Sequence, residues 1–219
     1  MNKNKLNLSI GFKKYLYNTA WLLSDKVLRI FLGLFISVWV IRYLGSENFG
    51  ILSYSVSFVG IFSVFANLGI DEFIVKNLVS NTNDRDKILG TSLVLKFGGA
   101  FLSIFLVFLT LQFTTTNFFE KKIIFIICLT LFFSSFNVLK SFFQSQVKAK
   151  LQSSAGIIVL VFSSVMKIFL ITSSLPLIYF AYLIFIEKVL ESGMLVFFYL
   201  KNKLNIFNWK FSFSTACYL

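Results

Sequence analysis

Residues 88–111, ILGTSLVLKFGGAFLSIFLVFLTL, form an apolar run that contains a single charged residue, Lys96. At about 1.5 Å per residue, a helix over this run is about 36 Å long, enough to cross the roughly 30 Å hydrocarbon core of a bilayer. The apolar residues are continuous and do not alternate with polar ones, so a helix is favoured over a strand of a membrane barrel. The run therefore predicts a membrane-spanning helix.

The whole chain has the composition of a membrane protein. It is 57% hydrophobic and 14% charged, whereas a soluble domain is about 45–50% apolar and about 25% charged. In water such a chain would expose extended apolar patches. Histidine is absent and the two cysteines, Cys128 and Cys217, lie far apart, so the sequence predicts neither a zinc site nor another cofactor.

Further apolar runs of similar length flank this one. The predicted spans cover residues 21–41, 49–70, 88–111, 123–145, 155–174 and 177–200. Short polar connections separate them, and Pro176 begins the last helix, where its missing N–H costs least. We therefore predict an all-α membrane protein in which residues 1–219 form a single transmembrane bundle of six helices.

Lysine and arginine are distributed unequally about these spans. The segments on the side of the N-terminus carry Lys3, Lys5, Lys13, Lys14, Lys76, Arg85, Lys87, Lys140, Lys148, Lys150, Lys201, Lys203 and Lys210. The segments on the opposite side carry Arg42, Lys121 and Lys122. Because cytoplasmic loops of membrane proteins are enriched in Lys and Arg, this imbalance predicts that both termini are cytoplasmic. It also explains the net charge of +12 without a nucleic-acid partner.

Charged residues also fall within the predicted spans or at their edges. On insertion scales each costs about 2.5–3.5 kcal/mol at a helix centre, so such residues normally face a partner or a wet cavity. By helical rise, Arg29 and Lys96 lie about 12 Å from the cytoplasmic ends of their spans, and Lys167 and Glu187 about 18–20 Å. Because their depths match, we predict that Lys167 pairs with Glu187. The bases of this set outnumber its acids: Lys26, Arg29, Lys96, Lys167 and Lys188 stand against Asp25, Glu187 and Glu191.

Three of these bases are candidate substrate-binding residues: Arg29, Lys96 and Lys167. Lys96 shares one helix face with the small residues Gly99 and Ser103. Such a face can line a cavity, but small and hydroxyl residues also line helix–helix contacts in membranes. Cavity lining and structural pairing are therefore the two alternatives for these bases.

Other charged residues are expected to form structural ion pairs: Asp25, Glu187, Lys188 and Glu191. Asp25 can pair with Arg29, one helical turn away. Asp71 and Glu72 lie at the end of a span, and we expect them to be solvated. No acidic residue lies within sequence reach of Lys96, so that base is expected to lack a partner of its own.

Four short stretches carry a resemblance to a known family. Residues 42–45 (RYLG) and 47–50 (ENFG) follow a basic N-terminus and an apolar first helix. Residues 67–70 (NLGI) and the loop at 143–150 (FQSQVKAK) come later in the chain. In this order they resemble the N-terminal half of the bacterial polysaccharide transporter family, the O-antigen and lipid-linked oligosaccharide flippases, which are related to MATE-type exporters.

The resemblance implies two six-helix bundles around a cavity that opens alternately to each side, with this chain as the first, N-terminal lobe. The stretch after Lys210 looks like the approach to another apolar segment, so we expect the chain to be truncated before a second bundle. The implied function is translocation of an undecaprenyl-pyrophosphate-linked oligosaccharide, an O-antigen or capsular repeat unit, across the bacterial cytoplasmic (inner) membrane. Basic residues of the first bundle would attract the pyrophosphate. The implied partners are this lipid-linked substrate, membrane lipid, a glycan polymerase and export machinery.

Three other functions compete with this interpretation. A MATE-type exporter of cationic drugs should have a site dominated by carboxylates, whereas bases dominate here. A membrane enzyme would need a general acid or base, such as His or paired carboxylates, and Glu187 with Glu191 is the sole candidate pair. A non-transporting partner of another membrane protein is the third alternative. The intramembrane charges favour a non-enzymatic flippase.

Overall fold

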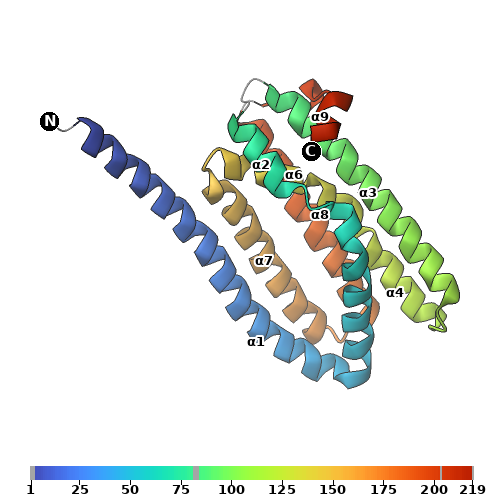
Figure 1. Ribbon diagram of the computed structural model, residues 1–219. Coiled ribbons are helices and arrows are strands. Elements are labelled where there is room, and N and C mark those ends of the chain that lie inside the picture. Colours follow the sequence, from blue (N-terminus) through green and yellow to red (C-terminus); the bar gives the residue numbers. More distant parts are fainter. Residues whose placement is uncertain (1–2, 81–83, 203, 219) are drawn as a thin grey trace.

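The computed structural model describes residues 3–80, 84–202 and 204–218. These residues form helices and turns without a strand, which confirms the prediction of an all-α membrane protein. Figure 1 shows a bundle in which successive helices run up and down the long axis, with both ends of the chain toward the same end of it.

The first two predicted spans belong to one long helix, α1 (Lys3–Asn67), which bends at Gly45. Gly45 has φ 74° and ψ 171°, a conformation that glycine adopts readily because it has no Cβ. The bend divides α1 into a first limb, residues 3–44, and a second limb, residues 46–67, which returns along the bundle (Figure 1). The glycine of the RYLG stretch thus sets the angle between these limbs.

The second limb ends in a short break. Leu68 and Gly69 have positive φ values of 55° and 66°, and α2 (Asp71–Ser80) follows at once. Asp71 and Glu72 occupy the first turn of α2, where the unpaired N–H groups of a helix favour carboxylates. The helical structure therefore extends ten residues beyond the predicted span.

The third predicted span lies within α3 (Arg85–Phe113), but the fourth span, 123–145, is a broken helical segment. Hydroxyl groups lie at its breaks: Thr130 Oγ1 donates to the Ile127 carbonyl at 2.6 Å and Ser134 Oγ to the Leu131 carbonyl at 2.5 Å. Such bonds compete with the regular backbone hydrogen bonds of a helix. The segment consists of α4 (Phe118–Cys128), α5 (Thr130–Ser134), the 3₁₀ turn η2 (Ser135–Asn137) and α6 (Val138–Ser145).

Two more long helices complete the bundle, α7 (Ala149–Thr172) and α8 (Leu177–Lys201), followed by η3 (Ile206–Asn208) and α9 (Phe213–Tyr218). We propose that the two limbs of α1, α3, the α4–α6 segment, α7 and α8 are the six crossings; α8 is as long as α7 but carries charged residues in its middle. Within the described residues, four helical stretches are long and apolar enough to cross a membrane: Thr19–Ser80, Arg85–Phe113, Phe118–Ser145 and Ala149–Thr172.

Small residues allow α3 to pack closely against the second limb of α1. A Cβ added at Gly99 would lie only 2.3 Å from the Phe65 carbonyl oxygen. Ser103 Oγ donates to the Phe62 carbonyl at 2.8 Å. Close approach at small residues is the usual way in which helices associate in membranes. At these positions the polar face of α3 is therefore a packing face and not the wall of a cavity.

The segment after α8 folds back onto α3. The backbone N–H of Lys210 donates to the Asp86 carbonyl at 3.2 Å, and Trp209 Nε1 donates to Tyr199 Oη at 3.0 Å. A Cβ added at Gly90 would lie 2.7 Å from the Lys210 carbonyl oxygen, so the close contact requires glycine there. The segment is thus held against the end of the bundle at which both termini lie.

Candidate functional site

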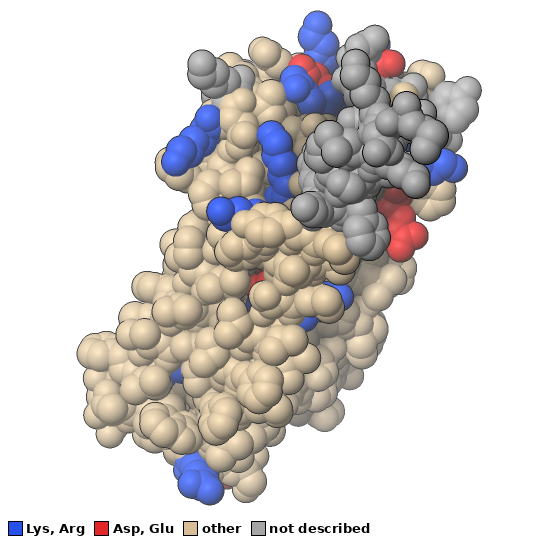
Figure 2. Space-filling model, turned by 90° about the vertical axis from the view of Figure 1, so that its left-hand side faces the viewer, with Lys and Arg blue, Asp and Glu red and all other residues tan. Residues whose placement is uncertain are grey.

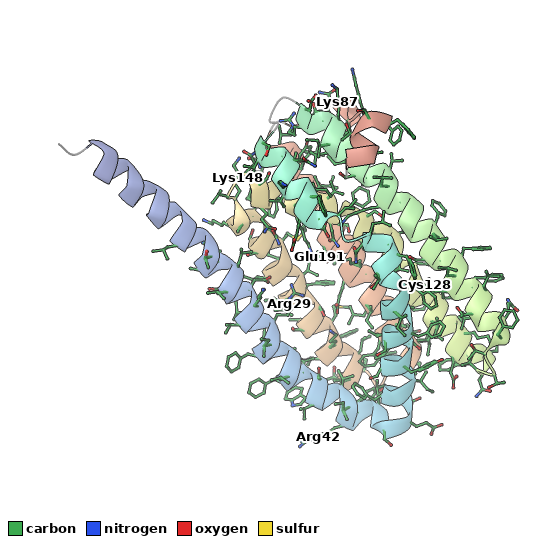
Figure 3. The ribbon with its side chains drawn as sticks, viewed as in Figure 1. Arg29, Arg42, Lys87, Cys128, Lys148 and Glu191 are labelled. Carbon is green, nitrogen blue, oxygen red and sulfur yellow. The ribbon has the colours of Figure 1, made fainter. Side chains whose placement is uncertain are left out.

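Charged side chains form a layer between two apolar clusters of the core. Along α8, residues 177–185 belong to one cluster and residues 194–199 to the other, and the charged residues lie between them. Figure 3 shows Arg29 of α1 and Glu191 of α8 in the middle of the bundle, with Lys148 near one end and Arg42 at the other. This layer is where the sequence predicted the deepest charges.

Two cavities lie beside the charged layer, where α1, α7 and α8 meet. The polar cavity has a volume of about 180 Å³ and is lined by Arg29, Thr130, Gly156, Val159, Ile184, Glu187, Lys188 and Glu191. The apolar cavity has a volume of about 170 Å³, lies toward the Gly45 bend, and is lined by Leu32, Gly33, Ile36, Ser37, Val40, Phe49, Leu52, Leu160, Ser164, Lys167, Phe180 and Ile184.

An ion pair separates the two cavities. Lys167 Nζ lies 2.9 Å from Glu187 Oε1, so the pairing predicted from their depths is present. Ser163, one turn before Lys167 on α7, donates its hydroxyl to the same carboxylate oxygen. Lys167 lines the apolar cavity, Glu187 lines the polar cavity, and Ile184 lines both. The pair therefore stands between the cavities.

Glu191 holds two lysines at once. Its carboxylate lies 2.5 Å from Lys140 Nζ of α6 and 2.8 Å from Lys188 Nζ on α8. By the distribution of Lys and Arg, Lys140 counts among the cytoplasmic bases and has no predicted partner, although it lies inside the predicted span 123–145. Its place within that span is the signal by which an intramembrane charge in need of an acid could have been found. Glu191 thus ties α6 to α8 at the rim of the polar cavity.

Arg29 is the least engaged of the ion-paired bases in the layer. Its Nη2 lies 3.5 Å from Asp25 Oδ1, and 53% of its side chain is exposed. Asp25 Oδ1 is buried and has no hydrogen-bond partner among the described residues. The pair rests on Gly156 of α7, where an added Cβ would lie 3.0 Å from Asp25 Oδ1 and 3.1 Å from Arg29 Nη2. The Arg29 guanidinium can therefore turn toward a better acceptor in the polar cavity.

Lys96 occupies a different environment. Its side chain is fully buried, its Nζ lies 2.6 Å from Asp71 Oδ1, and Ser141 Oγ donates to the same oxygen at 3.1 Å. The expectation that Lys96 lacks an acidic partner is therefore wrong. Asp71 is 47% exposed, so it is open to solvent as expected but is also paired with Lys96, and Glu72 is exposed as expected. Lys96 lines neither of the two cavities. Its binding of substrate stays a prediction, and the geometry favours a structural role.

The charged layer carries a small excess of positive charge. Asp25, Glu187 and Glu191 are its acids, and each lies within 3.5 Å of a base. Lys26 is exposed on the first limb of α1. The bases of the layer are Arg29, Lys140, Lys167 and Lys188, one more than the acids. An anion entering the polar cavity would balance this excess.

The fold and these cavities define a helical membrane protein whose bundle encloses charged groups at mid-depth. Residues 15–219 match the sequence model of a family described as "Polysaccharide biosynthesis protein". The chain belongs to this family, which confirms the predicted resemblance and, with the apolar helices, supports a membrane role in polysaccharide transport. The relation to MATE-type exporters stays a prediction. No curated protein and no solved structure matches the chain.

Proposed function

We propose that the protein is a flippase that moves an undecaprenyl-pyrophosphate-linked oligosaccharide, an O-antigen or capsular repeat unit, across the cytoplasmic membrane. Its termini would lie on the cytoplasmic side, as the distribution of Lys and Arg predicts. Family membership and the excess of positive charge beside the polar cavity support this proposal. The protein would change the position of its substrate and not its covalent structure.

The weak ion pair and the exposure of Arg29 are the main support for this proposal. The other ion-paired bases of the layer hold their carboxylates at 2.5–2.9 Å, whereas Arg29 is 3.5 Å from Asp25 and half exposed at the polar cavity. A guanidinium can bind a phosphate through two parallel hydrogen bonds. Arg29 is therefore the base best placed to exchange its weak partner for a diphosphate.

The volume of the polar cavity limits how much of the substrate it can hold. Pockets for drug-sized ligands have volumes of roughly 300–1,000 Å³, and the polar cavity has about 180 Å³. We propose that it receives the charged headgroup alone, while the sugars and the polyprenyl chain stay outside it. Passage toward the apolar cavity would then require the Lys167–Glu187 pair to separate, because that pair stands between the two cavities.

A MATE-type exporter of cations fits the site less well. A cationic substrate needs a carboxylate that can leave its present partner, but Glu187 and Glu191 already accept from bases at 2.5–2.9 Å. Asp25 is the loosely held acid, yet its Oδ1 is buried against Gly156. The exposed member of that pair is the base, Arg29, which favours an anionic ligand.

The test replaces Arg29 at the chromosomal locus by Ala or Lys and measures surface glycan, lipid-linked oligosaccharide and protein abundance. At normal abundance, Arg29→Ala should lower surface glycan at least tenfold, since losing a hydrogen bond to a charged group costs about 1.5–3 kcal/mol. Arg29→Lys should restore little, because lysine acts as a point charge. Arg42→Ala, the same loss of charge at the opposite end of the bundle, is the matched control and should have no effect.

The experiment tests the role of Arg29 and the flippase function separately. Normal glycan display by Arg29→Ala at normal abundance would remove Arg29 from substrate binding. Deletion of the whole gene should abolish display and cause lipid-linked oligosaccharide to accumulate on the cytoplasmic leaflet. Unchanged display after deletion would reject the flippase itself.

A further inference from the structure

A third cavity lies away from the charged layer, at the end of the bundle where both termini lie. It has a volume of about 300 Å³ and shares no lining residue with the polar or the apolar cavity. The FQSQVKAK loop contributes two of its residues, so this family-like stretch is part of its wall. The lining residues are Leu78, Arg85, Phe142, Gln146, Lys148, Asn202 and Leu204.

Two bases line this terminal cavity with one carboxylate beside them. Arg85 Nε donates to Asp86 Oδ1 at 2.9 Å, which leaves the two terminal amino groups of the guanidinium for a further acceptor. Lys148 Nζ lies 3.4 Å from the amide oxygen of Asn202, and the described part of the chain shows no carboxylate in an ion pair with it. The cavity therefore has more positive charge than its neighbours balance.

The surroundings of the cavity are basic as well. Figure 2 shows Lys and Arg gathered toward this end of the molecule and few charges over the middle of the visible face. Exposed lysines on the elements that line the cavity include Lys76, Lys87 and Lys201, and Lys87 is paired with Asp84 at 2.9 Å. At physiological ionic strength a charge acts over roughly 8 Å, so Lys76 and Lys201 add to the positive charge at this end of the molecule.

The backbone that carries Lys148 is fixed in place. Val147 has a positive φ of 53°, which is uncommon for a branched residue. The N–H groups of Val147 and Lys148 donate to the carbonyls of Gln144 and Phe143 at 3.0 and 2.9 Å. The turn therefore holds Lys148 and Gln146 at the cavity wall, and binding of a ligand does not have to order this backbone.

The remaining wall is apolar. Leu78 and Phe142 are buried, and Leu204 is partly buried in the same cluster. A free phosphate ion would gain nothing from such a wall, whereas a glycerol backbone and the start of an acyl chain would. Basic pockets between membrane helices near the cytoplasmic surface are known to take anionic lipid headgroups.

We infer that the terminal cavity binds the phosphodiester headgroup of an anionic phospholipid. The Arg85 amino groups and Lys148 Nζ contact the phosphate, the amides of Gln146 and Asn202 contact the headgroup, and the apolar wall covers the glycerol. This site is separate from the proposed substrate site, so the inference stands whether or not the protein flips a glycan lipid.

The test measures lipid binding to the delipidated protein in neutral detergent by native mass spectrometry and by thermal shift. Phosphatidylglycerol should bind at least ten times more tightly than phosphatidylcholine with the same acyl chains, and salt should weaken the binding. The double variant Arg85→Gln, Lys148→Gln should lower the affinity for phosphatidylglycerol about tenfold or more, since each of its two substitutions removes a charged hydrogen-bond donor. Lys122→Gln, the same charge loss at an exposed lysine of α4 that does not line the cavity, should change the affinity less than twofold.

A second variant guards against a folding defect. Gln146 is exposed, so the Gln146→Glu variant should fold normally. Because it adds a negative charge to the cavity, it should also weaken the binding of phosphatidylglycerol. Equal binding of the two lipids, or unchanged affinity in the double variant, would overturn the inference. Binding of glycerol phosphate or inorganic phosphate as tight as that of phosphatidylglycerol would overturn the lipid assignment and leave a soluble phosphate as the ligand.

Discussion

The Lys96–Asp71 ion pair should respond unequally to the loss of its two partners. The Lys96 side chain is 0% exposed and that of Asp71 is 47% exposed. Removing one partner of a buried pair costs about 3–5 kcal/mol when the other charge is left uncompensated. Asp71→Asn leaves the ammonium of Lys96 in that state, so we expect the full cost. Lys96→Met leaves a carboxylate that keeps the Ser141 hydroxyl and can be hydrated, so we expect about 1–2 kcal/mol.

Thermal unfolding of the purified protein in detergent measures this difference. For a chain of this size, 1 kcal/mol shifts Tm by about 2–4 °C, so Asp71→Asn should lower Tm by about 6–20 °C and Lys96→Met by about 2–8 °C. The double variant removes both charges and should recover most of the loss caused by Asp71→Asn. Lys26→Met, at an exposed lysine of α1, is the matched control and should shift Tm by no more than about 2 °C.

Two results would refute the reasoning. One is a Tm for Lys96→Met as low as that for Asp71→Asn, which would mean that the exposure of Asp71 gives it no access to water. The other is a double variant as unstable as Asp71→Asn, which would mean that the uncompensated ammonium is not the source of the cost. The comparison rests on differences between variants, so it does not depend on the absolute stability of the bundle.

Three further predictions concern the topology and the close contacts between helices. In a background without native cysteines, a cysteine at Asn48 should react with an impermeant maleimide from outside intact cells and one at Asn83, which lies outside the described residues, should not. The reverse pattern would invert the topology. Gly99→Ala should reduce membrane abundance severalfold because its Cβ meets the α1 backbone, whereas Gly98→Ala, which faces open space, should not; equal abundance would show that the helices can separate without cost. Gly90→Ala should release the segment after α8, seen as faster proteolysis of that segment at normal abundance of the rest; unchanged proteolysis would contradict the close packing.

The sequence by itself determined the helical class and the positions of most helices. Long apolar runs admit one solution in lipid, because every backbone N–H and C=O must be paired within its own segment. Charged residues are costly in the same environment, so those inside the spans stood out in the sequence. The depth of each residue along its span was enough to match Lys167 with Glu187. These properties depend on the composition and order of one segment at a time, which a sequence displays directly.

The tertiary structure decided which charged residues contact one another. Asp71 meets Lys96 only because the chain breaks at Leu68 and Gly69 and starts a second helix, and backbone conformation at two residues cannot be read from apolar runs. Glu191 binds Lys140 because α6 and α8 pack together, a contact between residues far apart in the sequence. Helical rise fixes the height of a residue along the bundle, but its direction around the axis depends on how each neighbour packs. The sequence therefore located the charged layer, and packing determined that Arg29, and not Lys96, faces the polar cavity.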